Sequence, residues 1–340
     1  MPSREERRTN SGGDEASAAA RPTARARVIN LLKTLVTLAL LGIVAATVDL
    51  RRVGQALLSV RWGDFLLAIL LYQVGILVRA YRWRALLRGQ GVEVSLPRLV
   101  NLYYVGTFFN SFLPSGFGGD VVRMIEVLQD GARGAAAVGT VLVDRLMGLE
   151  VLLAMALCAL PFCWRLVPRS AVIAVLALMG GTTLALSILL SQRLAASLMR
   201  RSRLARKALE QKGVSSRAAF GRYGRGALLR AAGASLAFNL ILILTQMLLG
   251  RAVGVRIAIG YFFVFVPIIS ALLALPISIS GFGVREGGYV LLFGLAGVGA
   301  GEATAMSLLF YGLNLATGLV GAGLYLWQAF VVQRSHHNHN

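Results

Sequence analysis

The 340-residue sequence has few charged residues, only two cysteines and only three histidines. Cys158 and Cys163 lie five positions apart, and they form neither a disulfide framework nor a CxxC or Cys/His metal spacing. The histidines occupy positions 336, 337 and 339 in the C-terminal tail. Residues 1–335 therefore cannot use a mechanism that needs a histidine base, nucleophile or metal ligand.

Sequence signatures of catalysis are also missing. No Gx4GK[ST] loop, HExxH pair or SxxK motif occurs in a context that would support chemistry. We expect a protein that is not an enzyme and has no cofactor and no resident metal.

Apolar residues and basic charge dominate the remaining composition. The hydrophobic set makes up 56% of the chain and charged residues 15%, against about 25% charged residues in soluble domains. One water-facing core of this size could not bury so much apolar surface. The net charge of +20 would suit nucleic acid, but arginine beside long apolar runs is typical of the cytoplasmic loops of membrane proteins. The composition therefore predicts a polytopic membrane protein with no nucleic-acid partner.

Long apolar runs predict an all-α fold. Six runs reach the roughly 20 residues that a membrane-spanning helix needs; they cover 28–48, 63–87, 135–163, 171–191, 228–250 and 303–331. The predicted organisation is a disordered cytoplasmic tail over 1–27, a transmembrane domain over 28–334 with a basic cytoplasmic loop at 192–228, and a polar tail over 335–340.

Two shorter apolar runs, 98–113 and 258–275, each continue into proline and then the tetrapeptide SGFG. Paired Gly/Pro-broken hydrophobic segments in two halves of a chain are typical of transporter-like proteins. The pattern predicts two re-entrant hairpins that form an inverted repeat with about six full spans; eight or nine plain spans is the alternative. The residues assigned to hairpin geometry are Pro114, Gly116, Gly118, Gly119, Pro276, Gly281 and Gly283.

The distribution of arginine predicts the topology. Six arginines in 1–27, five in 79–98 and eleven basic residues in 193–230 favour the cytoplasmic side of the inner membrane. Both termini are then cytoplasmic and the two hairpins enter from opposite faces. On this map 33 of the 35 basic residues lie in tails, loops or interfacial segments. The other two, Arg145 and Arg285, are expected at membrane depth.

Six charged residues are candidates for contact with a head group. They are Asp120, Arg123, Asp144, Arg145, Arg285 and Glu286. Charge at membrane depth is costly, so such residues are usually paired or functional.

Each candidate has a structural alternative. Asp120 is expected to cap a helix over 121–129 and to pair with Arg123; alternatively that helix start and Arg123 receive an anion. Arg285 suits a phosphate through its fork of donors, unless Glu286 neutralises it.

Asp144 and Arg145 lie within the run 135–163, with Gly148 one turn after Asp144. We expect them to pair with neighbouring helices, with a charged substrate path or proton path as the rival. Arg82, beside Tyr81 and Trp83, is predicted to be interfacial.

Four motifs in order carry a resemblance to a known family. They are RAYRWRALL at 79–87, FFNSFLPSGFGGDVVR at 108–123, VLVDRLMGL at 141–149 and PISISGFGVREG at 276–287. Together they resemble the lysylphosphatidylglycerol synthase transmembrane-region family, also called flippase-like domain proteins, over roughly residues 30–330. The positions that match the family pattern are Arg82, Pro114, Gly116, Gly119, Asp120, Arg123, Asp144, Arg145, Gly148, Pro276, Gly281, Gly283, Arg285 and Glu286.

The resemblance implies an integral inner-membrane protein. In the best understood relatives this region moves an aminoacylated phospholipid between leaflets, and in others it accompanies glycosyltransferases that act on isoprenoid carriers. The family's synthases carry a soluble aminoacyl-transfer domain that this sequence lacks, so aminoacylation is not expected. The leading hypothesis is a flippase of an anionic phospholipid or of a lipid-linked isoprenoid-phosphate or glycolipid intermediate. The rival is a non-transporting scaffold for a membrane glycosyltransferase or synthase.

Overall fold

The computed structural model describes residues 48–112, 118–132, 134–164, 167–190, 223–274 and 281–337, with isolated positions at 35, 38–39, 42, 46 and 278. Every regular element in these ranges is a helix, which confirms the all-α prediction. The tail 1–27, nearly all of the run 28–48 and most of the loop 192–228 fall outside the described residues, as do Pro114, Gly116 and Pro276.

The helices follow the predicted apolar runs closely. They are α3 (Leu50–Leu58), α4 (Trp62–Gly89), α5 (Leu96–Phe112), α6 (Gly118–Gln129), α7 (Gly134–Cys163), α8 (Arg169–Leu190), α12 (Arg225–Ala252), α13 (Ile259–Ala274), α14 (Val284–Leu295) and α15 (Ala300–His337). The short α3 was not predicted. Its N-cap is Asp49, whose carboxylate accepts a hydrogen bond from the Arg51 backbone N–H at 2.9 Å.

Four of these helices are long and apolar enough to cross a membrane: α4, α8 from Val172, α12, and α15 as far as Gln328. The 30-residue α7 is as long, but it carries Asp144, Arg145 and Glu150 among its apolar residues. The described part of the chain is therefore that of a multi-pass membrane protein.

Close contact between helix backbones fixes the packing. α4 packs along α12, and α15 packs along α5. Gly321 of α15 lies so close to α5 that a Cβ there would overlap the carbonyl oxygen of Tyr104. Small residues at such crossings are typical of membrane helices, which associate through close van der Waals packing.

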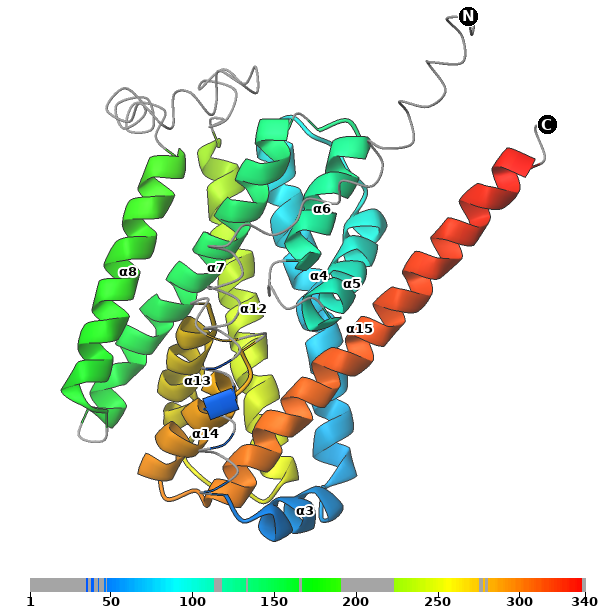
Figure 1. Ribbon diagram of the computed structural model, residues 1–340. Coiled ribbons are helices and arrows are strands. Elements are labelled where there is room, and N and C mark those ends of the chain that lie inside the picture. Colours follow the sequence, from blue (N-terminus) through cyan, green and yellow to red (C-terminus); the bar gives the residue numbers. More distant parts are fainter. Residues whose placement is uncertain are drawn as a thin grey trace, which may run out of the picture.

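Two pairs of shorter helices fold back on themselves, α5 with α6 and α13 with α14. The first pair lies in the upper half of Figure 1 and the second in the lower half. In the first pair the Gly119 backbone N–H donates to the Asn110 side-chain oxygen at 2.8 Å, and a Cβ on Gly119 would overlap the Gly106 carbonyl. In the second pair Gly281 and Gly283 both hold φ of +78°, which only glycine adopts readily.

The crossing of α5 and α15 gives a matched test. Gly321→Ala should lower the free energy of unfolding by about 1–3 kcal/mol, because the new methyl group collides with backbone that cannot move aside. Gly323→Ala, two residues further along α15, meets no atom within 4 Å and should be neutral or slightly stabilising. Thermal unfolding in detergent measures both variants; equal stability of the two would contradict the crossing.

Candidate functional site

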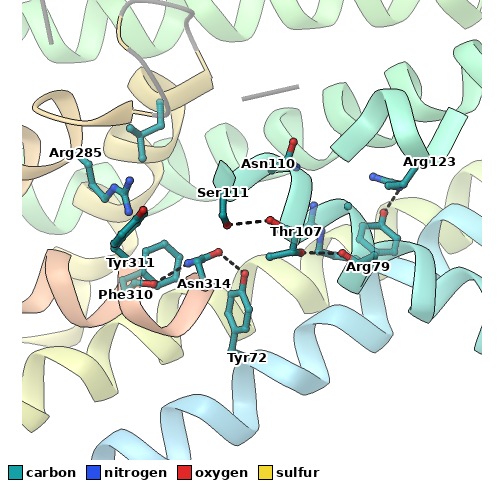
Figure 2. Close-up of a pocket in the computed structure, with 13 residues that line it drawn as sticks. Tyr72, Arg79, Thr107, Asn110, Ser111, Arg123, Arg285, Phe310, Tyr311 and Asn314 are labelled. Carbon is teal, nitrogen blue, oxygen red and sulfur yellow. Dashed lines mark hydrogen bonds between the residues drawn. The ribbon is translucent and has the colours of Figure 1, made fainter. Parts of the chain in front are cut away.

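A polar cavity of about 230 Å³ lies between the two helix pairs. Its walls come from α4, α5, α6, α14 and α15, together with Leu273 of α13 (Figure 2). The cavity therefore draws residues from both halves of the chain, and the two Gly-broken pairs meet across it.

Three arginines line this cavity: Arg79, Arg123 and Arg285. No carboxylate stands among the described residues of its wall. Arg285, the second residue of α14, is 7% exposed, and its guanidinium lies 5.0 Å from the centre of the Tyr311 ring. Arg79 lies 4.8 Å from the ring centre of Tyr103. The cavity is thus strongly electropositive.

Hydroxyl and amide groups supply the rest of the polar wall. They belong to Tyr72, Tyr103, Thr107, Asn110, Ser111, Tyr311 and Asn314. Tyr72 donates to the Asn314 side-chain oxygen at 2.6 Å, and Ser111 donates to the Thr107 carbonyl at 2.9 Å. The Tyr103 and Thr107 hydroxyls likewise donate within the protein, to Asp144 and to the Tyr103 carbonyl, so the arginines are the main donors that face the cavity.

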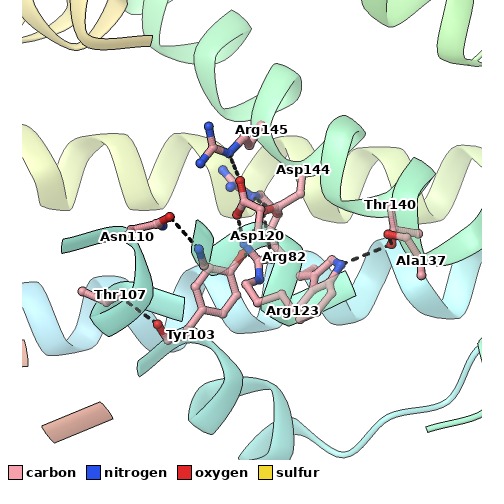
Figure 3. A network of polar contacts seen from close by, with 12 residues as sticks. Arg82, Tyr103, Thr107, Asn110, Asp120, Arg123, Ala137, Thr140, Asp144 and Arg145 are labelled. Atoms are coloured by element: carbon pink, nitrogen blue, oxygen red, sulfur yellow. Dashed lines mark hydrogen bonds and ion pairs between the residues drawn. The ribbon is translucent and has the colours of Figure 1, made fainter. Parts of the chain in front are cut away.

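Behind the cavity lies a buried charge network centred on Asp144, which is 1% exposed (Figure 3). Its carboxylate accepts from Arg82 Nε at 2.7 Å, from the Tyr103 hydroxyl at 2.8 Å and from Arg123 at 3.4 Å. Arg82 also donates to Ser235 at 3.2 Å. The network joins α4, α5, α6, α7 and α12.

Asp120 lies inside α6, so the expectation that it caps a helix over 121–129 is wrong. The helix begins three residues earlier than predicted, at Gly118. Asp120 instead pairs with Arg123 at 3.2 Å and with Arg145 of α7. The predicted pairing of Asp120 with Arg123 forms, and Asp144 and Arg145 pair with neighbouring helices as expected.

Arg82 is not the interfacial residue that the sequence predicted. It is 3% exposed and pairs with Asp144, and Gly148 leaves it room, because a Cβ at that glycine would lie 2.7 Å from Arg82 Nη1. Arg123 is also buried, at 2% exposure. The expectation that only Arg145 and Arg285 lie apart from tails, loops and interfaces is therefore wrong, since Arg82 and Arg123 are buried as well.

Glu286 turns back onto the start of its own helix. Its carboxylate accepts from the Gly283 backbone N–H at 2.7 Å and from the Ser307 hydroxyl at 3.5 Å. A carboxylate in the first turn of a helix satisfies backbone donors there and complements the helix dipole. Glu286 thus fixes the turn that presents Arg285 to the cavity.

Sequence reasoning missed several residues of the cavity wall. Arg79 had a usable signal, since its spacing of three from Arg82 puts both on one helix face. Tyr311 and Asn314 lay within the apolar run 303–331, where nothing distinguished them from packing residues. Among the described residues no three His, Cys, Asp or Glu side chains gather as a metal site.

The Arg82–Asp144 pair gives the sharpest test of this network. Arg82→Met leaves a buried carboxylate short of its nearest charge partner, at a cost of about 3–5 kcal/mol. Adding Asp144→Asn removes the stranded charge, so the double variant should be more stable than the sum of the two single losses predicts.

Arg98, which pairs with Glu126 and is 28% exposed, is the control. Arg98→Gln should cost at most about 1 kcal/mol in the same detergent unfolding experiment. An Arg82→Met protein as stable as Arg98→Gln would show that the buried charge network contributes little to the free energy of unfolding.

The sequence matches a known protein family and a curated membrane protein. The model of the family described as "Lysylphosphatidylglycerol synthase TM region" matches residues 30–321. The UPF0104 membrane protein PH1989 of Pyrococcus horikoshii is 32% identical over 85 residues, 24% of this chain and 25% of that protein. The match with this relative thus spans about a quarter of its length. The family match spans most of the chain, and it includes both helix pairs and the network at Asp144. The chain belongs to the lysylphosphatidylglycerol synthase transmembrane-region family.

Proposed function

We propose that the protein moves a lipid with an anionic head group across the cytoplasmic membrane. The lipid is an anionic phospholipid or a lipid-linked intermediate such as an isoprenoid phosphate or glycolipid. The head group passes through the arginine-lined cavity while its apolar chains stay in the bilayer. The observation that carries this proposal is a cavity with three arginines and no lining carboxylate among the described residues.

The arrangement of the helix pairs supports movement between leaflets. The α5–α6 and α13–α14 pairs start from opposite ends of the molecule and meet at the cavity (Figure 1). In transporters with inverted repeats, a substrate site lies where two such broken segments meet near the bilayer midplane. We therefore assign both pairs as re-entrant hairpins.

The surroundings of the cavity suit an amphiphile. Leu273 lines the polar cavity, and the preceding residue, Leu272, lines an apolar groove of about 450 Å³ between α8, α13 and α14. Arg285 faces the cavity, and Gly288, one turn later on α14, lines the groove. A phosphate at Arg285 would thus have an apolar surface for its chain close by.

No nucleotide-binding motif accompanies this cavity in the sequence, so we propose downhill or ion-coupled movement and assign no catalytic role to its residues. Substrate delivery by a membrane synthase or glycosyltransferase fits the proposal, since the family includes synthases.

Reconstituted protein tests transport directly. Arg285→Ala should abolish the movement of an anionic fluorescent phospholipid between leaflets of liposomes, and Arg285→Lys should retain part of the rate, because an ammonium keeps the charge and loses the fork. Arg256→Ala, an exposed arginine in the loop between α12 and α13, is the matched control and should keep the wild-type rate.

Abundance and melting temperature must be compared in parallel. Wild-type protein that moves no lipid would favour the scaffold hypothesis over transport. A stable Arg285→Ala protein with the full rate would remove Arg285 from the path.

Topology reporters test the hairpin assignment. Fusions after residues 130 and 215 should both report cytoplasm, and a fusion at residue 299 should report the outside, because each hairpin returns to the face it entered. An external signal at 130 would make α5–α6 a full crossing and break the inverted repeat.

A further inference from the structure

We infer that the head group is a compact, doubly negative phosphate without an amine, that is, a phosphate monoester or a diphosphate. This inference rests on the proposed function and narrows it. It separates this chain from a carrier of lysylphosphatidylglycerol, whose head group bears amino groups.

Positive charge exceeds negative charge around the cavity. Five arginines surround the cavity and the network behind it, namely Arg79, Arg82, Arg123, Arg145 and Arg285. In the part of the chain that the structure describes, three carboxylates lie in the same region: Asp120, Asp144 and Glu286. Among the described residues the arginines of this largely buried region thus outnumber the carboxylates by two, and a dianion balances that excess more fully than a monoanion does.

The three carboxylates already have hydrogen-bond donors within the protein. Asp144 accepts from two arginines and a tyrosine, and Asp120 pairs with two arginines. Glu286 accepts from the start of its own helix and from Ser307. An ammonium in the cavity would lose its water beside like charges and find no carboxylate in the described wall.

The size of the cavity and the geometry of its donors also favour a phosphate. A volume of about 230 Å³ is below the roughly 300–1,000 Å³ of sites for drug-sized ligands, which suits a phosphate or diphosphate. Arg79 Nε and Arg123 Nε are buried and have no hydrogen-bond partner within the described part of the chain. Such guanidinium donors match the oxygens of a phosphate in pairs.

Binding to purified protein in detergent tests the inference without requiring transport. The probes are inorganic pyrophosphate and three dioctanoyl lipids: phosphatidic acid, phosphatidylglycerol and lysylphosphatidylglycerol. Phosphatidic acid, a monoester, should bind at least about tenfold more tightly than phosphatidylglycerol. Lysylphosphatidylglycerol should bind no better than phosphatidylglycerol, and pyrophosphate should compete with phosphatidic acid.

Matched variants localise the effect. Arg79→Gln should weaken the binding of phosphatidic acid about tenfold, since it removes one charge-assisted partner from the cavity wall. Arg256→Gln should bind like wild type. An equal loss in both variants would mean that phosphatidic acid binds a general basic surface, and it would overturn the inference.

The remaining outcomes separate this inference from the proposed function. If lysylphosphatidylglycerol binds or moves as well as phosphatidic acid does, the inferred head-group class is wrong and the transport proposal is unaffected. Selective binding of phosphatidic acid without movement in liposomes supports the head-group class and contradicts transport. Binding of pyrophosphate without phosphatidic acid would assign the site to a soluble phosphate and overturn the lipid head group.

Discussion

The ion pair between Arg82 and Asp144 holds the centre of this molecule. It joins α4 to α7 in a region where neither side chain reaches water, so each charge depends on the other. Tyr103 and Arg123 bind the same carboxylate and bring in α5 and α6, and Ser235 on α12 binds Arg82. Five helices therefore share one buried cluster, and any rearrangement of one helix has to keep its partners satisfied.

The same cluster explains the electrostatics of the cavity. Asp144 and Asp120 lie behind it, and both are engaged by arginines. Arg123 belongs to both features: it binds Asp120 and Asp144, and its side chain lines the cavity. The structural pairing and the functional role proposed from sequence as rivals are thus compatible at this residue, since one arginine can anchor the hairpin and face a phosphate.

Much of the helical framework was predictable, because apolar runs of spanning length depend only on composition along the chain. The glycine turn at 281–283 was equally readable, since a positive φ leaves a local signature. The buried position of Arg82 could not be predicted, because an arginine near aromatic residues at a helix end resembles an interfacial residue until its partner on α7 is known. The Asp120 cap failed because the helix already begins at Gly118, and the second partner of Asp120, Arg145, lies on another helix. Tyr311 and Asn314 could not be predicted as site residues, because they line the cavity only through the packing of α15 near α14 and α4.

The central claim is that the arginine-lined cavity holds the anionic head group of a membrane lipid. Native mass spectrometry of protein purified from its membrane in mild detergent measures this directly, because retained lipids are identified by mass. The account predicts a phosphate-bearing anionic lipid on the wild type, and its loss from an Arg79→Gln/Arg285→Gln variant that keeps the wild-type melting temperature. Retention of the same lipid by that variant, or retention of zwitterionic lipid alone by the wild type, would contradict it.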